Sequence, residues 1–287
     1  MASVIALAVT MMALIPPMPS AQAQLFGVSE QDEIRIGRQV EAELAKTYGF
    51  VNDPEATRHV ASIGLRLAHV SERPNLPWTY HILADKSVNA IAAPGGFVFV
   101  TRGLLSFVKS DDELAFVVGH ETTHVAHRHA VELAQRQMEL QFGAVLLSKL
   151  LFGGSLTAYQ LSSIASGLLV AKYSREKEYE ADHYGVIYAK KIGYDPRASV
   201  LFFERLQGLE QRPSAIGSAF ASHPPTPDRI KAVRNELRQM GYRMAGAEDT
   251  PGPTAPAESV TQPATTPSSG PAQRPSVPTS RYPYDDR

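Results

Sequence analysis

The segment His120-Glu121-Thr122-Thr123-His124 limits what this chain can fold into more than any other feature of its sequence. On a helix, the two histidines lie one turn apart on the same face, so both imidazoles can bind one metal ion. Glu121 lies beside them, where its carboxylate can take a proton from a water that the metal activates. The segment therefore predicts a helix that carries a catalytic metal site. His127 and His129 follow closely, so a solvated, histidine-rich helix is the alternative.

A catalytic site on this helix needs a third protein ligand from another segment. A metzincin would place a glycine and a third histidine after the motif, but those positions hold His127 and Ala130. The acidic segment from Ser174 to Asp182 offers a carboxylate instead, because Glu178 and Asp182 share one face of a helix. We expect Glu178 to bind the metal and Asp182 to accept the outer N–H of a ligand histidine. An ordinary charged helix is the alternative for this segment.

The composition limits the kinds of site that the chain can carry. The chain has no cysteine, which excludes disulfides, thiolate metal sites and a cysteine nucleophile, so any metal must bind His, Asp or Glu. The 28 basic and 29 acidic residues leave a formal charge of −1, and no basic patch stands out. We therefore expect no nucleic-acid partner.

The amino-terminal residues have the pattern of an export signal. Val4 to Ile15 is apolar, prolines follow it, and Ala21-Gln22-Ala23 has the small residues that signal peptidase recognises. An uncleaved anchor is the alternative, but the stretch is shorter than the roughly 20 apolar residues that span a bilayer. We predict a signal peptide over residues 1–23, cleavage near Ala23, and a periplasmic location with contact to the membrane as an option.

The rest of the chain predicts an α+β fold that is mainly helical. Ser29 to Tyr48 and the stretch after Asp53 have helical spacing, whereas Trp78 to Ala84 and Val88 to Val100 have strand character. A helix is expected from Asp111 through the histidines to about Met138, and helices continue to about Met240. We expect one domain over residues 24–245, with a small sheet whose edge lies beside the histidine helix.

Two further segments differ from this domain in composition. Residues 142–171 are strongly apolar but are interrupted by Gly153-Gly154-Ser155, so neither half reaches membrane-spanning length. We expect an apolar helical hairpin that packs on the domain or contacts a membrane surface; a transmembrane segment is the alternative. Residues 246–287 are rich in Pro, Ser and Thr and are expected to be disordered.

Four separate segments together resemble one known family. They are the histidine motif, the segment around Glu178 and Asp182, Asn89 to Gly96 with Gly103-Leu104-Leu105, and Ser222 to Ile230. Their content and order are similar to those of the HtpX, BepA and Oma-like zinc metallopeptidases, gluzincins related to the CAAX prenyl endopeptidases. The likeness extends from about Gln24 to Gly241 and includes neither the helical repeat domain of the BepA group nor the membrane spans of the HtpX group.

The resemblance implies a zincin-type domain with one zinc ion per chain. It assigns His120, His124 and Glu178 as metal ligands, Glu121 as the general base, and Asp182 as a carboxylate behind the ligands.

The resemblance also places His223 and Arg229 near the metal. In such enzymes this pair is thought to hold the substrate carbonyl or the developing oxyanion. In some members the histidine instead occupies the fourth zinc position and keeps the enzyme latent. Both roles stay open for His223.

The expected function is that of a zinc-dependent metalloendopeptidase of the cell envelope, a hydrolase active in protein quality control. It would hydrolyse peptide bonds in misfolded or misassembled proteins, which would pair with an edge strand formed by Ala93 to Val100. A hairpin turn at Pro94 and the paired glycines is the alternative for this segment. The alternative is a chaperone-like assembly factor whose protease activity is latent and gated by His223. The sequence predicts no oligomeric state.

Overall fold

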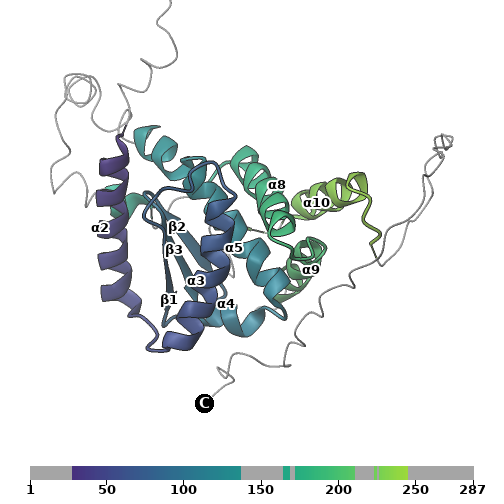
Figure 1. The fold of residues 1–287 in the computed structure, drawn as a ribbon, viewed down its shortest axis with the longest axis horizontal. Coiled ribbons are helices and arrows are strands. Elements are labelled where there is room, and N and C mark those ends of the chain that lie inside the picture. The colour runs from purple at the N-terminus through teal and green to yellow at the C-terminus, as the bar shows by residue number, and fades with distance from the viewer. Residues whose placement is uncertain (1–27, 137–163, 169–171, 211–222, 225, 245–287) are drawn as a thin grey trace, which may run out of the picture.

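A computed structural model of the chain describes residues 28–136, 164–168, 172–210, 223–224 and 226–244 (Figure 1). The predicted signal peptide, the predicted disordered tail and most of the apolar segment 142–171 lie outside these residues. Of that apolar segment, residues 164–168 are helical, and Ile164 and Ala165 are buried against the domain. Among the helices that the structure describes, none combines the length and apolar character needed to cross a bilayer.

The sheet has three strands, β1 (Thr79–Leu83), β2 (Ala90–Ala93) and β3 (Phe97–Thr101), in the order β1-β3-β2. β1 runs parallel to β3, and β2 runs antiparallel to it. Gly95 and Gly96 make the tight turn between β2 and β3 with φ angles of +79° and +101°, which glycine adopts without steric cost. Both regions predicted to have strand character therefore form strands.

The prediction that Ala93 to Val100 forms an edge strand is wrong. Phe97 to Val100 belong to β3, which is the central strand and is buried along its whole length. The strand at the edge on this side is β2, and it packs beside helix α5 (Asp111–Ala126). Alternation of apolar residues shows that a segment is a strand, but strand order depends on contacts that are distant in sequence.

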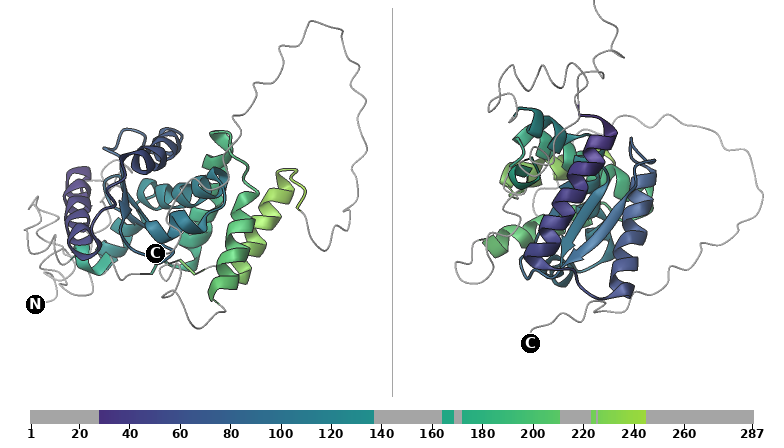
Figure 2. Two further views of the ribbon diagram at one scale, coloured as in Figure 1. Left: turned by 90° about the horizontal axis from the view of Figure 1, so that it is seen from below. Right: turned by 90° about the vertical axis from the view of Figure 1, so that its left-hand side faces the viewer.

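Helices cover both faces of the sheet. On one face lies α2 (Glu30–Tyr48), whose buried residues share a core with Phe97 and Phe99 of β3. On the other face lie α3 (Pro54–His69) and α5, which share a larger core with Val98 and Val100. Figure 2 shows α2 crossing the sheet on the outer side. The alternating residues of one strand thus separate two cores, as the geometry of a strand requires.

The remaining helices extend the domain beyond α5. They are α4 (Arg102–Phe107), α8 (Arg175–Lys191), α9 (Ala198–Glu210) and α10 (Pro227–Gln239). Helix α8 packs along α5, α9 packs against α5, α10 packs against α8, and α9 and α10 contact each other, away from the sheet (Figure 1). The described residues therefore form the mainly helical α+β domain that the sequence predicts.

Two glycines let α5 and α8 approach closely. A Cβ atom added to Gly185 of α8 would lie 3.1 Å from the backbone nitrogen of His120. A Cβ atom added to Gly119 of α5 would lie 3.2 Å from the carbonyl oxygen of Gly185. Both distances are shorter than an ordinary van der Waals contact, so a side chain at either position would push the two helices apart by a few tenths of an ångström.

The helix predicted to continue from Asp111 to about Met138 is interrupted. α5 ends at Ala126, the chain turns at His127 and Arg128, and residues 129–136 are helical again. Arg128 has a φ angle of +60°, a left-handed conformation that is unfavourable for a side chain with a Cβ atom. Its guanidinium nitrogen lies 2.9 Å from Glu33 Oε1 and donates to the Val28 carbonyl, so α2 holds the turn. The spacing of residues in the sequence does not predict this tertiary contact, so it did not predict the end of the helix.

Candidate metal centre

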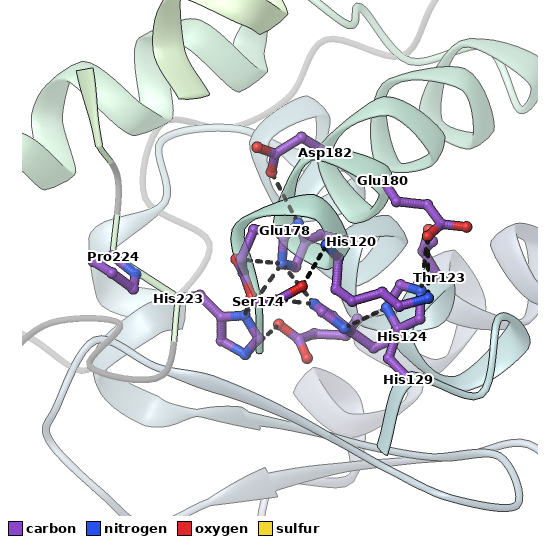
Figure 3. Close-up of polar contacts among 12 residues, drawn as sticks. His120, Thr123, His124, His129, Ser174, Glu178, Glu180, Asp182, His223 and Pro224 are labelled. Atoms are coloured by element: carbon purple, nitrogen blue, oxygen red, sulfur yellow. Dashed lines mark hydrogen bonds and ion pairs between the residues drawn. The ribbon is translucent and has the colours of Figure 1, made fainter. Parts of the chain in front are cut away.

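Helix α5 presents His120 and His124 side by side in the interior of the domain (Figure 3). Their Nε2 atoms are 3.1 Å apart, and His124 has no exposed surface. Ser110 begins the helix by accepting a hydrogen bond from the Glu113 backbone, and three acidic residues charge its first turn. The helical spacing therefore places the two imidazoles on one face, as the motif predicts.

Glu178 and His223 bring two further donors to the same point. Glu178, on the first turn of α8, lies with Oε2 3.6 Å from His120 Nε2 and with Oε1 3.8 Å from His124 Nε2. The Nδ1 atom of His223 is 3.4 Å from His120 Nε2 and 2.8 Å from Glu178 Oε1. Figure 3 shows the three histidine rings and the carboxylate converging. The structure thus gathers residues that are about a hundred positions apart in sequence.

These four residues fit a zinc ion in number, type and spacing. All four are buried, and their donor atoms lie within 4.8 Å of one another. With Zn–N and Zn–O bonds of about 2.0–2.2 Å, the donors of a tetrahedral site are about 3.3–3.5 Å apart. The observed separations of 2.8, 3.1, 3.4, 3.6 and 3.8 Å bracket that value. Imidazole nitrogens combined with one carboxylate are a typical ligand set for zinc.

Glu121 lies beside this cluster and is fully buried. Neither of its carboxylate oxygens has a hydrogen-bond partner among the residues that the structure describes. Burial raises the pKa of Glu121 above its ordinary value, although the nearby His223 and His120 oppose the shift. Burying a carboxylate without a hydrogen-bond partner costs folding free energy. The position of Glu121 is therefore explained if a polar group, such as water or substrate, enters the site and pairs with it.

Asp182 lies behind His120, one turn after Glu178 on α8. Its Oδ1 is 3.0 Å from His120 Nδ1, the nitrogen that faces away from the cluster. Arg229 binds the same carboxylate from the other side, with Nε 2.8 Å from Oδ2 and Nη2 2.6 Å from Oδ1. Burial alone would raise the pKa of Asp182, but Arg229 and His120 hold it below its ordinary value. An ionised Asp182 accepts the Nδ1–H of His120 and leaves Nε2 free to bind a metal.

Arg229 donates its hydrogen bonds to protein groups around the cluster. Its Nη1 is 2.8 Å from Glu178 Oε2 and donates to the carbonyl oxygens of His223 and Pro224, each at 3.0 Å. Arg229 lies in the first turn of α10, which Thr226 caps. Arg229 therefore ties the His223 segment to α8 and balances the negative charge of the two carboxylates.

The electrostatic environment favours a neutral His124 and an ionised Glu178, but it raises the pKa of His223. Burial lowers the pKa of His124 well below its ordinary value, and the neighbouring His120 lowers it further. Burial alone would raise the pKa of Glu178, but His223 and other positive neighbours hold it below its usual range. The carboxylates of Glu121 and Glu178 raise the pKa of His223 despite its burial. A neutral His124 and an ionised Glu178 are the forms that bind a metal.

Two residues at the site were not assigned a role from the sequence. The His129 Nδ1 atom lies 2.9 Å from His124 Nδ1, and the Tyr173 ring stacks on His124 with centroids 4.1 Å apart. His129 was visible only as one more histidine after the motif, because its contact depends on the turn at Arg128. Tyr173 carried no signal in the sequence beyond its position just before the α8 cap.

Comparison of the sequence with known proteins shows the family to which this site belongs. Residues 54–237, which include the metal cluster, match the sequence profile of Peptidase family M48. The chain belongs to this family. The match confirms the resemblance to the HtpX, BepA and Oma-like metallopeptidases, and with it a metalloprotease fold.

Individual relatives in the M48 family are also named as proteases. The chain is 30% identical to the mitochondrial metalloendopeptidase OMA1 of Schizosaccharomyces pombe over 214 residues, which cover 73% of this chain and 62% of that protein. It is 26% identical to the β-barrel assembly-enhancing protease of Escherichia coli, covering 79% and 47% of the two chains. The metalloprotease YcaL of E. coli is 33% identical, with 61% and 70% covered. The names favour a peptidase over the assembly factor weighed as the alternative.

The first two of these relatives are longer than the matched region. This chain spans 62% of the fungal protein and about half of the assembly-enhancing protease, at 47%. What the unmatched parts of those proteins contribute therefore does not transfer to this chain.

Proposed function

We propose that this chain is a zinc-dependent metalloendopeptidase that cleaves misfolded or misassembled proteins of the cell envelope. The observation that carries the proposal is the convergence of four buried donor atoms beside a buried carboxylate, Glu121, that has no hydrogen-bond partner in the described structure. Glu121 decides between the two kinds of zinc site, because a structural site needs no base, whereas a catalytic site needs a base and a ligand position that substrate can reach.

In this proposal His120, His124 and Glu178 hold one zinc ion per chain. When bound, zinc polarises the scissile carbonyl and brings the pKa of a bound water close to neutrality. Glu121 accepts the proton of the attacking water and returns it to the leaving amine. The raised pKa of Glu121 suits both steps, because a carboxyl group that titrates nearer neutrality can take up and give back a proton.

His223 is proposed to occupy the fourth ligand position when no substrate is bound. Its Nδ1 lies 3.4 Å from His120 Nε2 and 2.8 Å from Glu178 Oε1, which places it where a fourth donor belongs. Substrate and water require the same position, so the ring has to move aside before cleavage. Arg229, which donates to the backbone carbonyls of His223 and Pro224, is proposed to hold this segment beside the cluster, so that only the ring moves.

An extended segment of substrate is proposed to pair with β2. This strand is at the edge of the sheet and packs beside α5, the helix of the metal ligands. Pairing through backbone hydrogen bonds recognises any unfolded chain with little regard to its side chains, which suits a quality-control peptidase. The name of the assembly-enhancing protease and the predicted signal peptide support an envelope location.

The experiment that tests this function compares the wild-type chain with Glu121→Gln. The variant keeps the shape of the side chain but removes the proton acceptor, so we expect wild-type zinc content and a loss of at least about 100-fold in cleavage of an unfolded protein. Glu176→Gln, an exposed change on α8, is the matched control and should retain activity. Treatment with a chelator should abolish cleavage, and added zinc should restore it.

Cleavage by Glu121→Gln at the wild-type rate would contradict the proposed base. Absence of cleavage in the wild-type chain, with zinc bound, would contradict the proposed peptidase activity.

A further inference from the structure

His129 is a buried residue that the proposed chemistry does not use. It is only 1% exposed, and its Nδ1 atom lies 2.9 Å from the Nδ1 atom of His124. Two ring nitrogens at this distance form a hydrogen bond only if one carries a proton and the other does not. The pair therefore constrains the tautomers of both rings.

The position of His124 decides which nitrogen carries the proton. Its Nε2 faces the metal cluster, 3.1 Å from His120 Nε2, so a metal-bound His124 has its proton on Nδ1. His129 must then accept a hydrogen bond from this N–H through an unprotonated Nδ1 and carry its own proton on Nε2. The Nε2 atom of His129 faces Glu180 Oε2 at 3.3 Å, an ion-pair distance without the alignment of a hydrogen bond.

We propose that His129 is a positioning residue that fixes the tautomer and the ring orientation of the zinc ligand His124. The inference rests on the proposed zinc site. It gives His129 the role toward His124 that Asp182 has toward His120, whose Nδ1 lies 3.0 Å from the Asp182 carboxylate. Helix α8 would thus support both histidine ligands from behind, through Asp182 directly and through Glu180 by way of His129 (Figure 3).

The turn at Arg128 is what makes this contact available. In a continuous helix, residues five positions apart point about 140° away from each other, so His129 could not meet His124. The positive φ angle of Arg128 redirects the chain, and its ion pair with Glu33 holds the redirected segment. The strained conformation of Arg128 is explained if it brings His129 into contact with the metal ligand His124.

His127, His129 and Glu180 are also close enough together to suggest a second metal site, with their donor atoms within 4.8 Å. Two observations disfavour it. The ammonium group of Lys177 lies 3.6 Å from Glu180 Oε2 and repels a cation there. A metal on His129 Nε2 would also leave a proton on its Nδ1, which would face the proton on His124 Nδ1 and break the contact.

The test compares His129→Asn with His129→Leu. The asparagine Oδ1 takes the place of the ring Nδ1 and accepts a hydrogen bond, whereas leucine has a similar size and no acceptor. Both variants lose the contact with Glu180, so their difference isolates the acceptor. We expect His129→Leu to raise the zinc dissociation constant by about 10- to 100-fold and His129→Asn to stay close to the wild type. Chelator competition measures the affinity, the visible spectrum of the cobalt-substituted protein reports the ligand geometry, and circular dichroism checks folding.

A second measurement uses the wild-type chain and does not depend on a folded variant. Nitrogen-15 NMR of histidine side chains in the zinc-bound protein should show His129 protonated on Nε2 and unprotonated on Nδ1. The opposite tautomer would overturn the proposal, and so would equal zinc affinity in the wild type and His129→Leu, or equal losses in both variants. Zinc that stays bound in His124→Ala would instead contradict the proposed metal site itself, and the inference with it.

Discussion

Three acidic residues of helix α8 each contact a different histidine. Glu178 lies 2.8 Å from His223, Asp182 lies 3.0 Å from His120, and Glu180 lies 2.6 Å from His127. The first two share a helix face, as their spacing predicts, and the third projects toward the turn after α5. Residue type alone does not distinguish these positions, but the atoms that each carboxylate contacts do.

Loss of the third ligand is expected to reduce metal binding. Glu178→Ala removes the only carboxylate of the described metal cluster, so zinc retained after dialysis should fall from about one per chain to well below half. Glu176→Ala, two positions away and exposed, is the control. Elemental analysis measures both, and unchanged zinc in Glu178→Ala would move the third ligand to another residue.

Removal of the proposed fourth donor is expected to raise activity. His223→Ala opens the position that His223 Nδ1 occupies near His120 and Glu178, so cleavage of an unfolded protein should increase severalfold. His69→Ala, a change at an exposed position of α3, should have no effect. A loss of about 100-fold or more in His223→Ala would assign the ring to stabilising the oxyanion instead.

The stability of the metal-free chain should depend on pH through two buried histidines, His124 and His129. Burial lowers the pKa of His129 to about 4, helped by Lys177, and the pKa of His124 is also lowered. Below about pH 6.5 these two rings take up protons in the unfolded chain but not in the folded chain, so they make the free energy of unfolding fall as the pH falls. Each ring contributes up to about 1.4 kcal/mol per pH unit.

Urea unfolding of the metal-free chain between about pH 6 and about pH 5 measures this slope. His129→Asn should flatten it. An equal slope in the wild type and His129→Asn would show that His129 is protonated in the folded chain.

At the scale of elements, the crossing of α5 and α8 sets the distance between the ligands. Gly185→Val should destabilise the fold by about 1–3 kcal/mol and weaken zinc binding, because the added atoms collide with the α5 backbone near His120. Gly208→Ala on α9 has open space around it and should be neutral or stabilising by up to about 1 kcal/mol. Thermal unfolding and zinc affinity distinguish the two, and wild-type values in Gly185→Val would show that the crossing tolerates a larger separation.

The sequence predicted elements well where local rules decide them. Helical spacing, capping residues and strand alternation identified α2, α3, α5 and the three strands, and the shared face of Glu178 and Asp182 was also local information. Prediction from the sequence failed where a contact between residues distant in sequence determines the structure. The ion pair between Arg128 and Glu33 ends the helix early, and strand order places β3 in the centre. His223 was predicted only through the family resemblance, because about a hundred residues separate it from the motif.

At the scale of the whole molecule, the metal cluster lies where three parts of the domain meet. α5 is packed between the sheet and the helices α8 and α9, and each of α5, α8 and the segment before α10 supplies residues to the cluster. Any change in the packing of these parts alters the separation of the donor atoms. Metal binding should therefore stabilise the folded domain, since the site does not exist in the unfolded chain.

The most direct measurement is a crystal structure of the zinc-loaded chain with diffraction data on both sides of the zinc absorption edge. The account predicts one anomalous peak per chain, within bonding distance of His120 Nε2, His124 Nε2 and Glu178. A chain without a peak there, or with its peak among His127, His129 and Glu180, would contradict the central claim.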